Sequence, residues 1–378
     1  MKRILIFGMT ENPGGVESFL MNYYRNIDRN KIQFDFLCNS HELVAYEDEL
    51  LSLGGRTYHI TARSKNRSLY RKELKEVFEK HSSEWDAIWV NVCSLANIDY
   101  LKIAKKYGIK KRIIHSHNSC NMDGFLRGIL HRWNKLHVDR YATDFWACSE
   151  DAAKWFYKKK LLPKALVIHN AIDVKSMAFD QNKRNQIRQK IGVSDNTYLI
   201  GNIGRLHFQK NQSFMLDVFA NFYRENKNSM LILVGQGGDE EMLQEKCENL
   251  GLQDAVIFAG VQKDICAWLS AFDLFLFPSL FEGLGIVALE AQANGVVVIA
   301  SDGVIPVEVK MNNNFEFYSL NRTPKEWANR IGKIKEENER ENAQMIFKTF
   351  VDNGYEINTE VKKLERLLET SYEKSSIN

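Results

Sequence analysis

Residues 273–301 read DLFLFPSLFEGLGIVALEAQANGVVVIAS and contain a complete strand, loop, helix and second strand. The runs DLFLFPS (273–279) and VVVIAS (296–301) have the length and apolar composition of buried strands. Between them, residues 285–294 have a helical pattern that begins after a glycine-rich turn and ends before Gly295. Two buried strands joined by a crossover helix predict neighbouring parallel strands.

The same alternation continues through most of the chain. The other expected strands lie at residues 3–9, 34–38, 87–91, 112–117, 144–149, 166–170, 197–204, 230–235 and 255–260. Helical patterns follow the first strand, at Val16–Ile27, and lie at 69–81, 97–107, 210–226, 239–250 and 263–271. We therefore predict an α/β protein with two Rossmann-like, doubly wound domains. The expected domains are residues 1–170 and 171–350, followed by an amphipathic helix within 351–378.

The composition indicates a globular protein, with 44% hydrophobic and 26% charged residues in a chain of 378. Apolar runs stay far below the roughly 18 residues of a membrane span. The start MKRILIFGM soon meets Thr10, Glu11 and Asn12 without a cleavage site, so we expect a first strand and a cytoplasmic protein. The six cysteines, at 38, 93, 120, 148, 247 and 266, lack zinc spacing and are expected to be reduced thiols.

The charge is distributed unevenly along the chain. Residues 1–170 carry 28 Lys and Arg against 19 Asp and Glu, a net charge of +9, and the remainder carries −6. A basic first half suits anionic lipid headgroups or nucleic acid, although ordinary solvated charge is the simpler explanation. No interleaved aromatic residues form a nucleic-acid-binding module, so no nucleic-acid partner is expected.

Two glutamates in the opening stretch could bind hydroxyl groups. Glu282 lies among glycines on the loop, and Glu290 falls in the second turn of an apolar helix, where its side chain leans back toward the helix N-terminus. A buried carboxylate is costly unless something pairs with it. The partner could be the vicinal hydroxyls of a ribose or another polyol, or a basic side chain in a salt bridge.

Two cations follow the strand at 197–204, in the stretch GNIGRLHFQKN (201–211). Arg205 and Lys210 stand at a helix entry beside Gly204, where cations are unfavourable unless an anion is bound. Such a pair could clamp a diphosphate, and surface charge is the alternative.

Two glycine-rich turns also follow strands. TENPGGVESF (10–19) would let a ligand approach the backbone near Gly15 at a helix N-terminus, or it is a tight turn. VGQGGDEE (234–241) is better explained as a structural turn.

Two histidines end a strand in IIHSHNS (113–119). His115 and His117 are two residues apart and should face the same side of the strand. One could exchange a proton at a reacting centre while the other is a core residue, and no further metal ligands are evident nearby.

In combination, these motifs resemble the retaining family-4 glycosyltransferases, which have the GT-B fold. The match comprises PGGVE after the first strand, GR-x4-K at Gly204–Lys210, HNAID (169–173) at the domain junction, and E-x7-E at Glu282 and Glu290. It covers nearly the whole chain and is most similar to bacterial enzymes of capsular or exopolysaccharide synthesis.

The resemblance implies two domains that face each other across a cleft, with the terminal helix crossing back to the first. It implies transfer of a hexose or N-acetylhexosamine from a nucleotide-diphosphate donor, expected to be UDP-linked, to a saccharide or lipid-linked acceptor. The implied catalytic residues are Arg205, Lys210, Glu282 and His117, and the implied donor-binding residues are Gly15, Gly204, Gly283, Leu284, Gly285, Ile286 and Glu290. No cofactor or metal is expected, in agreement with the lack of a D-x-D motif in the sequence.

Three positions depart from the family pattern, at Ala171, Leu284 and Val297, and none removes a charged residue. Two alternatives remain open at this point. One is a sugar-nucleotide epimerase of the same fold, and the other is an inactive, sugar-nucleotide-binding partner in an envelope-polysaccharide complex. Peripheral contact of the basic domain with the inner face of an anionic membrane is a further expectation.

Overall fold

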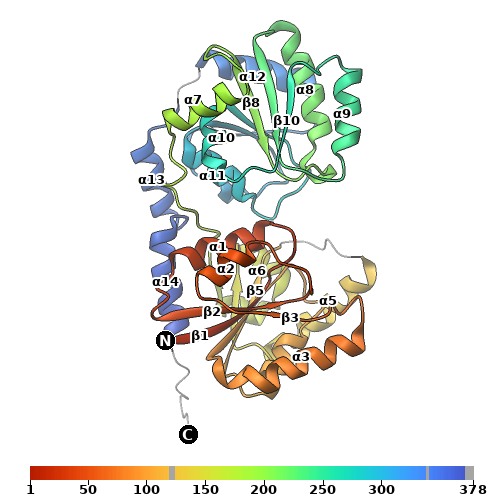
Figure 1. Ribbon diagram of the computed structural model, residues 1–378, viewed down its shortest axis with the longest axis vertical. Coiled ribbons are helices and arrows are strands. Elements are labelled where there is room, and N and C mark those ends of the chain that lie inside the picture. The colour runs from red at the N-terminus through yellow and green to blue at the C-terminus, as the bar shows by residue number, and fades with distance from the viewer. Residues whose placement is uncertain (119–123, 338–339, 371–378) are drawn as a thin grey trace. The chain divides into compact units, whose positions relative to one another are not determined.

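The computed structural model describes residues 1–118, 124–337 and 340–370. The chain divides into two compact units (Figure 1). Unit 1 comprises Met1–Ala171 and the segment that begins at Ile357, and unit 2 comprises Ile172–Glu356. Each unit is built on its own parallel sheet.

Unit 1 contains a seven-stranded sheet in the order β3-β2-β1-β4-β5-β6-β7, and every neighbouring pair is parallel. The strands are β1 (Lys2–Phe7), β2 (Ile32–Cys38), β3 (Thr57–His59), β4 (Ala87–Val92), β5 (Lys111–Ser116), β6 (Asp144–Ala147) and β7 (Ala165–Val167). The central strands are almost wholly buried and apolar, as a sheet covered on both faces requires.

Helices cover both faces of this sheet (Figure 1). One face packs against α1 (Gly15–Asn26), α2 (Glu47–Ser52) and α14 (Ile357–Glu369). The other packs against α3 (Arg67–His81), α4 (Asp99–Lys106) and α6 (Glu150–Phe156). The remaining helix, α5 (Phe125–His137), contributes no side chain to either apolar cluster. Short 3-10 helices lie at η1 (Ser82–Glu84), η2 (Val138–Arg140) and η3 (Lys159–Lys164).

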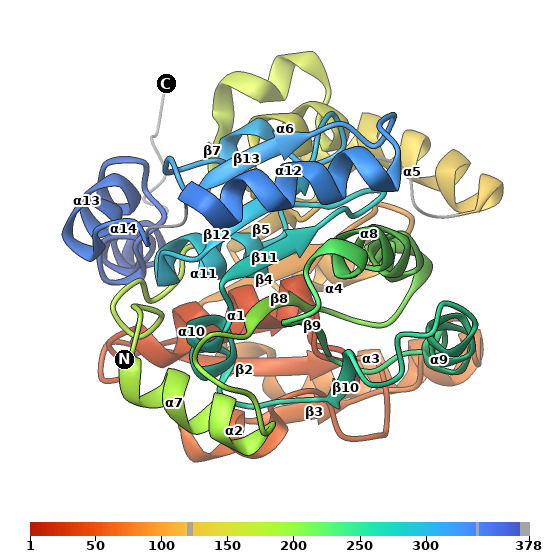
Figure 2. The same cartoon turned by 90° about the horizontal axis from the view of Figure 1, so that it is seen from above.

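Unit 2 contains a six-stranded sheet in the order β10-β9-β8-β11-β12-β13, again with parallel neighbours. The strands are β8 (Tyr198–Ile203), β9 (Ser229–Val234), β10 (Val256–Gly260), β11 (Leu274–Phe277), β12 (Val297–Ser301) and β13 (Phe315–Tyr318). One face is covered by α8 (Gln212–Glu225), α9 (Glu240–Asn249) and α12 (Pro324–Glu337). The other is covered by α7 (Gln181–Lys190), α10 (Ile265–Ala271), α11 (Ile286–Asn294) and α13 (Ala343–Asp352), which Figure 2 shows from above. Two 3-10 helices, η4 (Phe208–Lys210) and η5 (Val307–Val309), complete the unit.

The two sheets confirm the predicted pair of doubly wound α/β domains. The sequence reasoning missed β3 and β13, which are short outer strands of their sheets. The predicted terminal helix is α14, which packs on α1 within unit 1, and residues 371–378 of the predicted segment lie outside the described residues. Cys120 also lies outside them, and Cys38, Cys247 and Cys266 are buried free thiols. No helix in the described part of the chain is long and apolar enough to cross a bilayer.

Each sheet contains a point at which the direction of winding reverses. In unit 1 the chain winds from β1 outward to β3 and then returns to the other side of β1 as β4. In unit 2 it winds from β8 outward to β10 and returns beside β8 as β11. Ligands of open α/β sheets bind at the carboxyl ends of the strands at such a switch point. The loops after β1, β4, β8 and β11 are therefore where a site is expected.

Candidate active site

Lys210 and Glu282 form an ion pair at the switch point of unit 2. Lys210 ends η4, after β8, and its Nζ donates to Glu282 Oε1, after β11, at 2.6 Å. The side chains are only 16% and 6% exposed, respectively. The ammonium also lies 5.1 Å from the centroid of the Phe277 ring. Two predicted site residues that lie 72 positions apart in the chain thus meet in one small, partly desolvated cluster.

The loops that carry this pair are hydrogen-bonded to each other. Leu280 N donates to the Gln209 carbonyl at 2.8 Å, and Gln209 Nε2 donates to the Phe281 carbonyl at 3.0 Å. Asn211 Nδ2 adds a third bond, to the Pro278 carbonyl at 3.1 Å. These three bonds fix η4 against the loop before α11, so the position of Lys210 is set by the fold.

Glycine is required where the loop enters α11. Gly285 caps this helix with φ +79°, a left-handed conformation that side chains rarely adopt. A Cβ there would lie 3.1 Å from the Phe277 ring. On either side, Leu284 and Ile286 bury their side chains in the core. If these two residues contact a donor, they must do so through their backbone, as predicted for the 283–286 segment.

Lys210 also crosses the face of Gly204. A Cβ added to Gly204 would lie 3.3 Å from the Lys210 Cε, so the lack of a side chain leaves room for the lysine stem. Gly204 itself follows β8 and donates from its N–H to the Val234 carbonyl at 2.9 Å.

Glu290 lies in the second turn of α11, and its carboxylate has no hydrogen bond or ion pair with any residue that the structure describes. Burial raises the pKa of Glu290 to about 7. The side chain nevertheless keeps partial solvent exposure. A carboxylate that is desolvated and lacks a protein partner can accept hydrogen bonds from a ligand hydroxyl. Glu282 is thus the salt-bridged carboxylate of the two, and Glu290 the one without a partner.

Arg205 differs from Lys210 in both exposure and pairing. Its side chain is exposed, and within residues 1–118, 124–337 and 340–370 it has no hydrogen bond or ion pair. Only its backbone carbonyl is engaged, accepting from Gln212 Nε2 at 2.9 Å. The guanidinium can therefore meet an anion without first breaking an ion pair.

The glycine turn at 234–238 supports this loop and confirms the structural explanation of that motif. A Cβ on Gly237 would lie 2.1 Å from the Leu206 carbonyl oxygen. Leu206 N donates to the Gln236 carbonyl at 3.1 Å, and Asp239 N donates to the Leu206 carbonyl at 3.2 Å. The turn packs backbone to backbone beneath the segment that carries Arg205.

In unit 1, Gly15 is the first residue of α1, after β1. A Cβ added at Gly15 would have no atom within 4 Å, so protein packing does not account for glycine there. Nearby, the Glu17 carboxylate accepts from Thr10 N and Oγ1, at 3.2 and 2.5 Å, and burial raises its pKa. Glu17 therefore connects α1 to the loop after β1 by hydrogen bonds, and the space at Gly15 stays open.

His117 follows β5, at the same carboxyl edge of the unit 1 sheet. Its Nε2 lies 2.9 Å from Asn91 Oδ1, an acceptor, so the ring donates from Nε2 and presents an unprotonated Nδ1. Nδ1 is buried and has no hydrogen-bond partner in the structure. Burial lowers the pKa of His117 to about 3, so the ring is neutral at pH 7. Phe19 of α1 packs on the His117 ring, with centroids 4.9 Å apart.

His115 faces the same side of β5 as His117, as the spacing predicts, and the centroids of the two rings lie 4.2 Å apart. It is fully buried, and Trp89 Nε1 donates to its Nδ1 at 3.3 Å. His115 is therefore the core histidine of the two.

The predicted residues form two sets. In unit 2, Gly204, Lys210, Glu282 and Gly285 are brought together near Phe277. Arg205 lies on the connection after β8, and Glu290 lies in α11, the helix that follows the loop of Glu282. In unit 1, α1 links Gly15 to His117 through Phe19.

Sequence reasoning missed two residues of these sets. Asn91, at the end of β4, orients His117, and this contact across strands leaves no signal in the sequence. Asn211 has φ +57° before α8, and an asparagine directly before a helical pattern is a usable signal for such a conformation.

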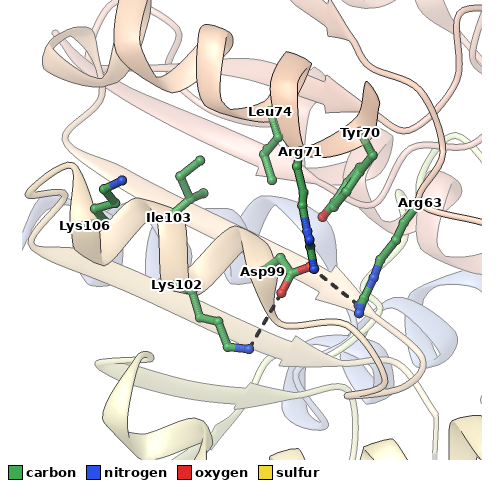
Figure 3. A pocket seen from close by; sticks show the side chains of 8 residues that line it. All are labelled: Arg63, Tyr70, Arg71, Leu74, Asp99, Lys102, Ile103 and Lys106. Carbon is green, nitrogen blue, oxygen red and sulfur yellow. Dashed lines mark ion pairs between the residues drawn. The ribbon is translucent and has the colours of Figure 1, made fainter. Parts of the chain in front are cut away.

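The structure also has a basic pocket that no motif indicated (Figure 3). Its volume is about 390 Å³, and it lies between α3 and α4 of unit 1. Asp99 is 3.5 Å from Arg63 and 3.7 Å from Lys102, and Arg71 and Lys106 add further positive charge. Two arginines and two lysines around one carboxylate could hold an anion. Among the described residues, no group of three or more His, Cys, Asp or Glu could bind a metal ion.

Comparisons with known proteins agree with this geometry. Residues 183–348 match the family described as "Glycosyl transferases group 1". The "Putative glycosyltransferase EpsF" of Bacillus subtilis is 28% identical over 99% of this chain and 98% of its own length. The "Capsular polysaccharide biosynthesis glycosyltransferase CapH" of Staphylococcus aureus is 24% identical over 85% of this chain and 88% of its own.

Among solved structures, Anabaena Alr3699/HepE, crystallised with UDP and glucose, superposes with a TM-score of 0.77. It is 20% identical, and the match covers 97% of this chain and 99% of that one. The fold is therefore that of the GT-B glycosyltransferases, with two Rossmann-like domains. Together, the group 1 domain over residues 183–348 and the GT-B fold support a glycosyltransferase.

Proposed function

We propose that this protein transfers a sugar from a nucleotide-diphosphate donor to a saccharide or lipid-linked acceptor, with retention at the anomeric carbon, in cell-surface polysaccharide synthesis. The donor we infer is UDP-hexose or UDP-N-acetylhexosamine. The observation that carries the proposal is the Lys210–Glu282 pair at the switch point of unit 2, with the side chains of Arg205, after β8, and Glu290, in α11, lacking a partner among the described residues. HepE, which was crystallised with UDP, and CapH, which is named for capsular polysaccharide biosynthesis, support the choice of substrates.

In this proposal, unit 2 binds the donor. Arg205 contacts the diphosphate in a fork, and Lys210 adds a second positive charge held in place by Glu282. Positive charge fixed at that position stabilises the leaving diphosphate as the glycosidic bond breaks, which lowers the barrier without reorganisation. We assign this role to the two side chains and infer a reaction that needs no metal ion.

Two carboxylates hold hydroxyl groups. Glu290, which lacks a protein partner, accepts hydrogen bonds from the two ribose hydroxyls. Glu282 has a second oxygen beyond the one that binds Lys210, and together with the backbone of Gly283–Ile286 it holds the donor sugar.

Unit 1 supplies the acceptor side. The open space at Gly15 admits the phosphates or the acceptor beside the N-terminus of α1. The neutral His117 ring accepts a hydrogen bond at Nδ1 from a hydroxyl near the anomeric carbon. Attack on the same face as the leaving group needs no covalent nucleophile, and we assign none. The positive charge of residues 1–170 also favours contact with an anionic membrane.

A panel of nucleotide sugars tests the proposal. Each is incubated with the protein, and thermal shift, donor hydrolysis and transfer to saccharide acceptors are measured with and without EDTA. One UDP-sugar should raise the melting temperature and be consumed, with product of retained configuration and equal rates in EDTA. Conversion of the donor to an isomeric nucleotide sugar without an acceptor would identify an epimerase instead. Binding without turnover on any acceptor or water would identify an inactive binding protein.

A further inference from the structure

Helix α5 exposes its apolar face to solvent, whereas an ordinary surface helix buries that face. Its sequence, FLRGILHRWNKLH, places Phe125, Leu126, Ile129, Leu130, Trp133 and Leu136 in solvent. Phe125 is 76% exposed and Trp133 is 63% exposed. At about 100° per residue, these six side chains lie within one arc of roughly 140°, which also includes His137 at the end of the helix. We call this arc the apolar stripe.

The face turned toward unit 1 is polar. His131 is buried, accepts at Nδ1 from Leu95 N at 3.1 Å, and stacks on Trp155 with centroids 4.4 Å apart. Asn134 Nδ2 donates to the Leu95 carbonyl at 2.7 Å. Lys135 Nζ donates to the Lys154 and Trp155 carbonyls, at 2.9 and 2.6 Å, and burial lowers its pKa. Hydrogen bonds therefore anchor the helix with the stripe exposed to solvent. The helix itself lies at the edge of unit 1 in both cartoon views (Figures 1 and 2).

The charges around the stripe are positive. Arg132 lies beside the stripe on one side, Arg127 lies beyond Asn134 on the other, and α5 contains no acidic residue. Asp139, which follows the helix, is paired with Lys158 at 2.7 Å and Lys160 at 3.2 Å. The unit as a whole belongs to the part of the chain that carries +9.

We propose that α5 lies in the interface of an anionic phospholipid membrane, with the apolar stripe among the acyl chains and the flanking arginines at the headgroups. An apolar arc with a tryptophan and leucines, bordered by arginines, has the amphipathic pattern of an interfacial helix. Its length of 13 residues is about 20 Å, too short to span a bilayer. Because α5 carries positive charge and no acidic residue, it favours anionic lipid over a second copy of this basic unit. This inference identifies α5 as the element that makes the membrane contact of the proposed function. It depends on that membrane contact and not on the sugar-transfer reaction.

Vesicle flotation tests this inference on the full chain. The wild type should float with vesicles of phosphatidylcholine and phosphatidylglycerol, much less with phosphatidylcholine alone, and less as salt rises. Ile129→Glu with Trp133→Glu should lower the apparent affinity for anionic vesicles at least about tenfold, since charge on the apolar stripe opposes its insertion among the acyl chains. Leu51→Glu with Met242→Glu is the matched control, with the same charge change at exposed positions of α2 and α9, and should float as the wild type does.

Two further measurements keep the outcome clear. Tryptophan fluorescence should shift to the blue when anionic vesicles are added, and Trp133→Phe should lose most of that shift while still floating. Thermal shift with nucleotide sugars, run on both double variants, reports donor binding separately, so failure of the sugar-transfer proposal would leave the flotation result standing.

Three results would overturn the inference. One is a wild type that stays unbound to anionic vesicles, and another is an Ile129→Glu with Trp133→Glu variant that floats as well as the control. In the third, sedimentation would show a wild-type dimer that this double variant dissociates, which would make the stripe an interface between copies of the chain.

Discussion

The Lys210 ammonium and the Glu282 carboxylate lie 2.6 Å apart, across two loops whose backbones are hydrogen-bonded to each other. Each charge is largely removed from water, so each needs the other as a partner to be stable in the folded protein. A change to either residue should therefore affect both stability and activity. In the proposed reaction, Glu282 holds the Lys210 side chain in place before the donor arrives.

Removal of Lys210 should therefore have two separable effects. Lys210→Ala leaves the Glu282 carboxylate without its partner and should destabilise the protein by about 3 kcal/mol. Lys210→Ala with Glu282→Gln should recover most of that stability, because no buried charge remains. Activity should stay low in both, which thermal unfolding and transfer rates would show. A double variant as unstable as Lys210→Ala would mean that the pair has no energetic coupling.

Arg205 should behave differently, since its side chain has no partner among the described residues. Arg205→Ala should leave the melting temperature unchanged and lower kcat markedly. Together with Lys210→Ala, it should cut kcat at least about 100-fold, as loss of charge stabilisation does elsewhere. Arg224→Ala, on the exposed surface of α8, is a control for loss of a surface arginine. Normal turnover in Arg205→Ala would remove Arg205 from the site.

Glu290 should make stability fall as pH rises. Its pKa is raised from an ordinary carboxyl value to about 7, so the folded state binds the proton more tightly than the unfolded state does. The stabilisation is complete below about pH 4.5 and is lost as pH rises through 7. Glu290→Gln should thus be more stable than the wild type at pH 8, by as much as about 3 kcal/mol, and should show no such slope. Chemical denaturation over pH 5–8 would measure this.

The same carboxylate should report nucleotide binding. Ribose hydroxyls that donate to Glu290 favour its charged form, so binding at pH 7 should release up to about half a proton. Calorimetry in buffers of different ionisation enthalpy measures that release. Glu290→Gln should bind more weakly and release none from this group. Equal proton release in the wild type and the variant would contradict the ribose role.

The two glycine-rich turns should respond in opposite ways to alanine. At Gly15 a methyl group meets no protein atom, so Gly15→Ala should fold normally and lose activity, because it fills space reserved for a ligand. At Gly237 a methyl group would lie 2.1 Å from the Leu206 carbonyl, so Gly237→Ala should be clearly destabilised. Melting temperatures and transfer rates of the two variants distinguish these effects. An active Gly15→Ala enzyme would leave that glycine without a proposed role.

The sequence by itself determined the architecture, because the strands of a parallel sheet are buried on both faces and therefore read as continuous apolar runs. It also marked the strand-to-helix turns where the site residues lie, since glycines and charges are unusual there. The outer strands β3 and β13 were missed because TYH (57–59) and FEFY (315–318) are short and contain polar residues, so neither forms a continuous apolar run.

Only the tertiary structure decided which residues have partners. It paired Glu282 with Lys210 and left Glu290 without one, although both glutamates occupy the same motif. It assigned His115 to the core and tied His117 to Asn91 on a neighbouring strand. It also turned the apolar side of α5 to solvent, whereas periodicity alone would have placed that side in the core. The reason is common to all three: periodicity shows which residues share a face, but contacts between distant segments decide what that face meets.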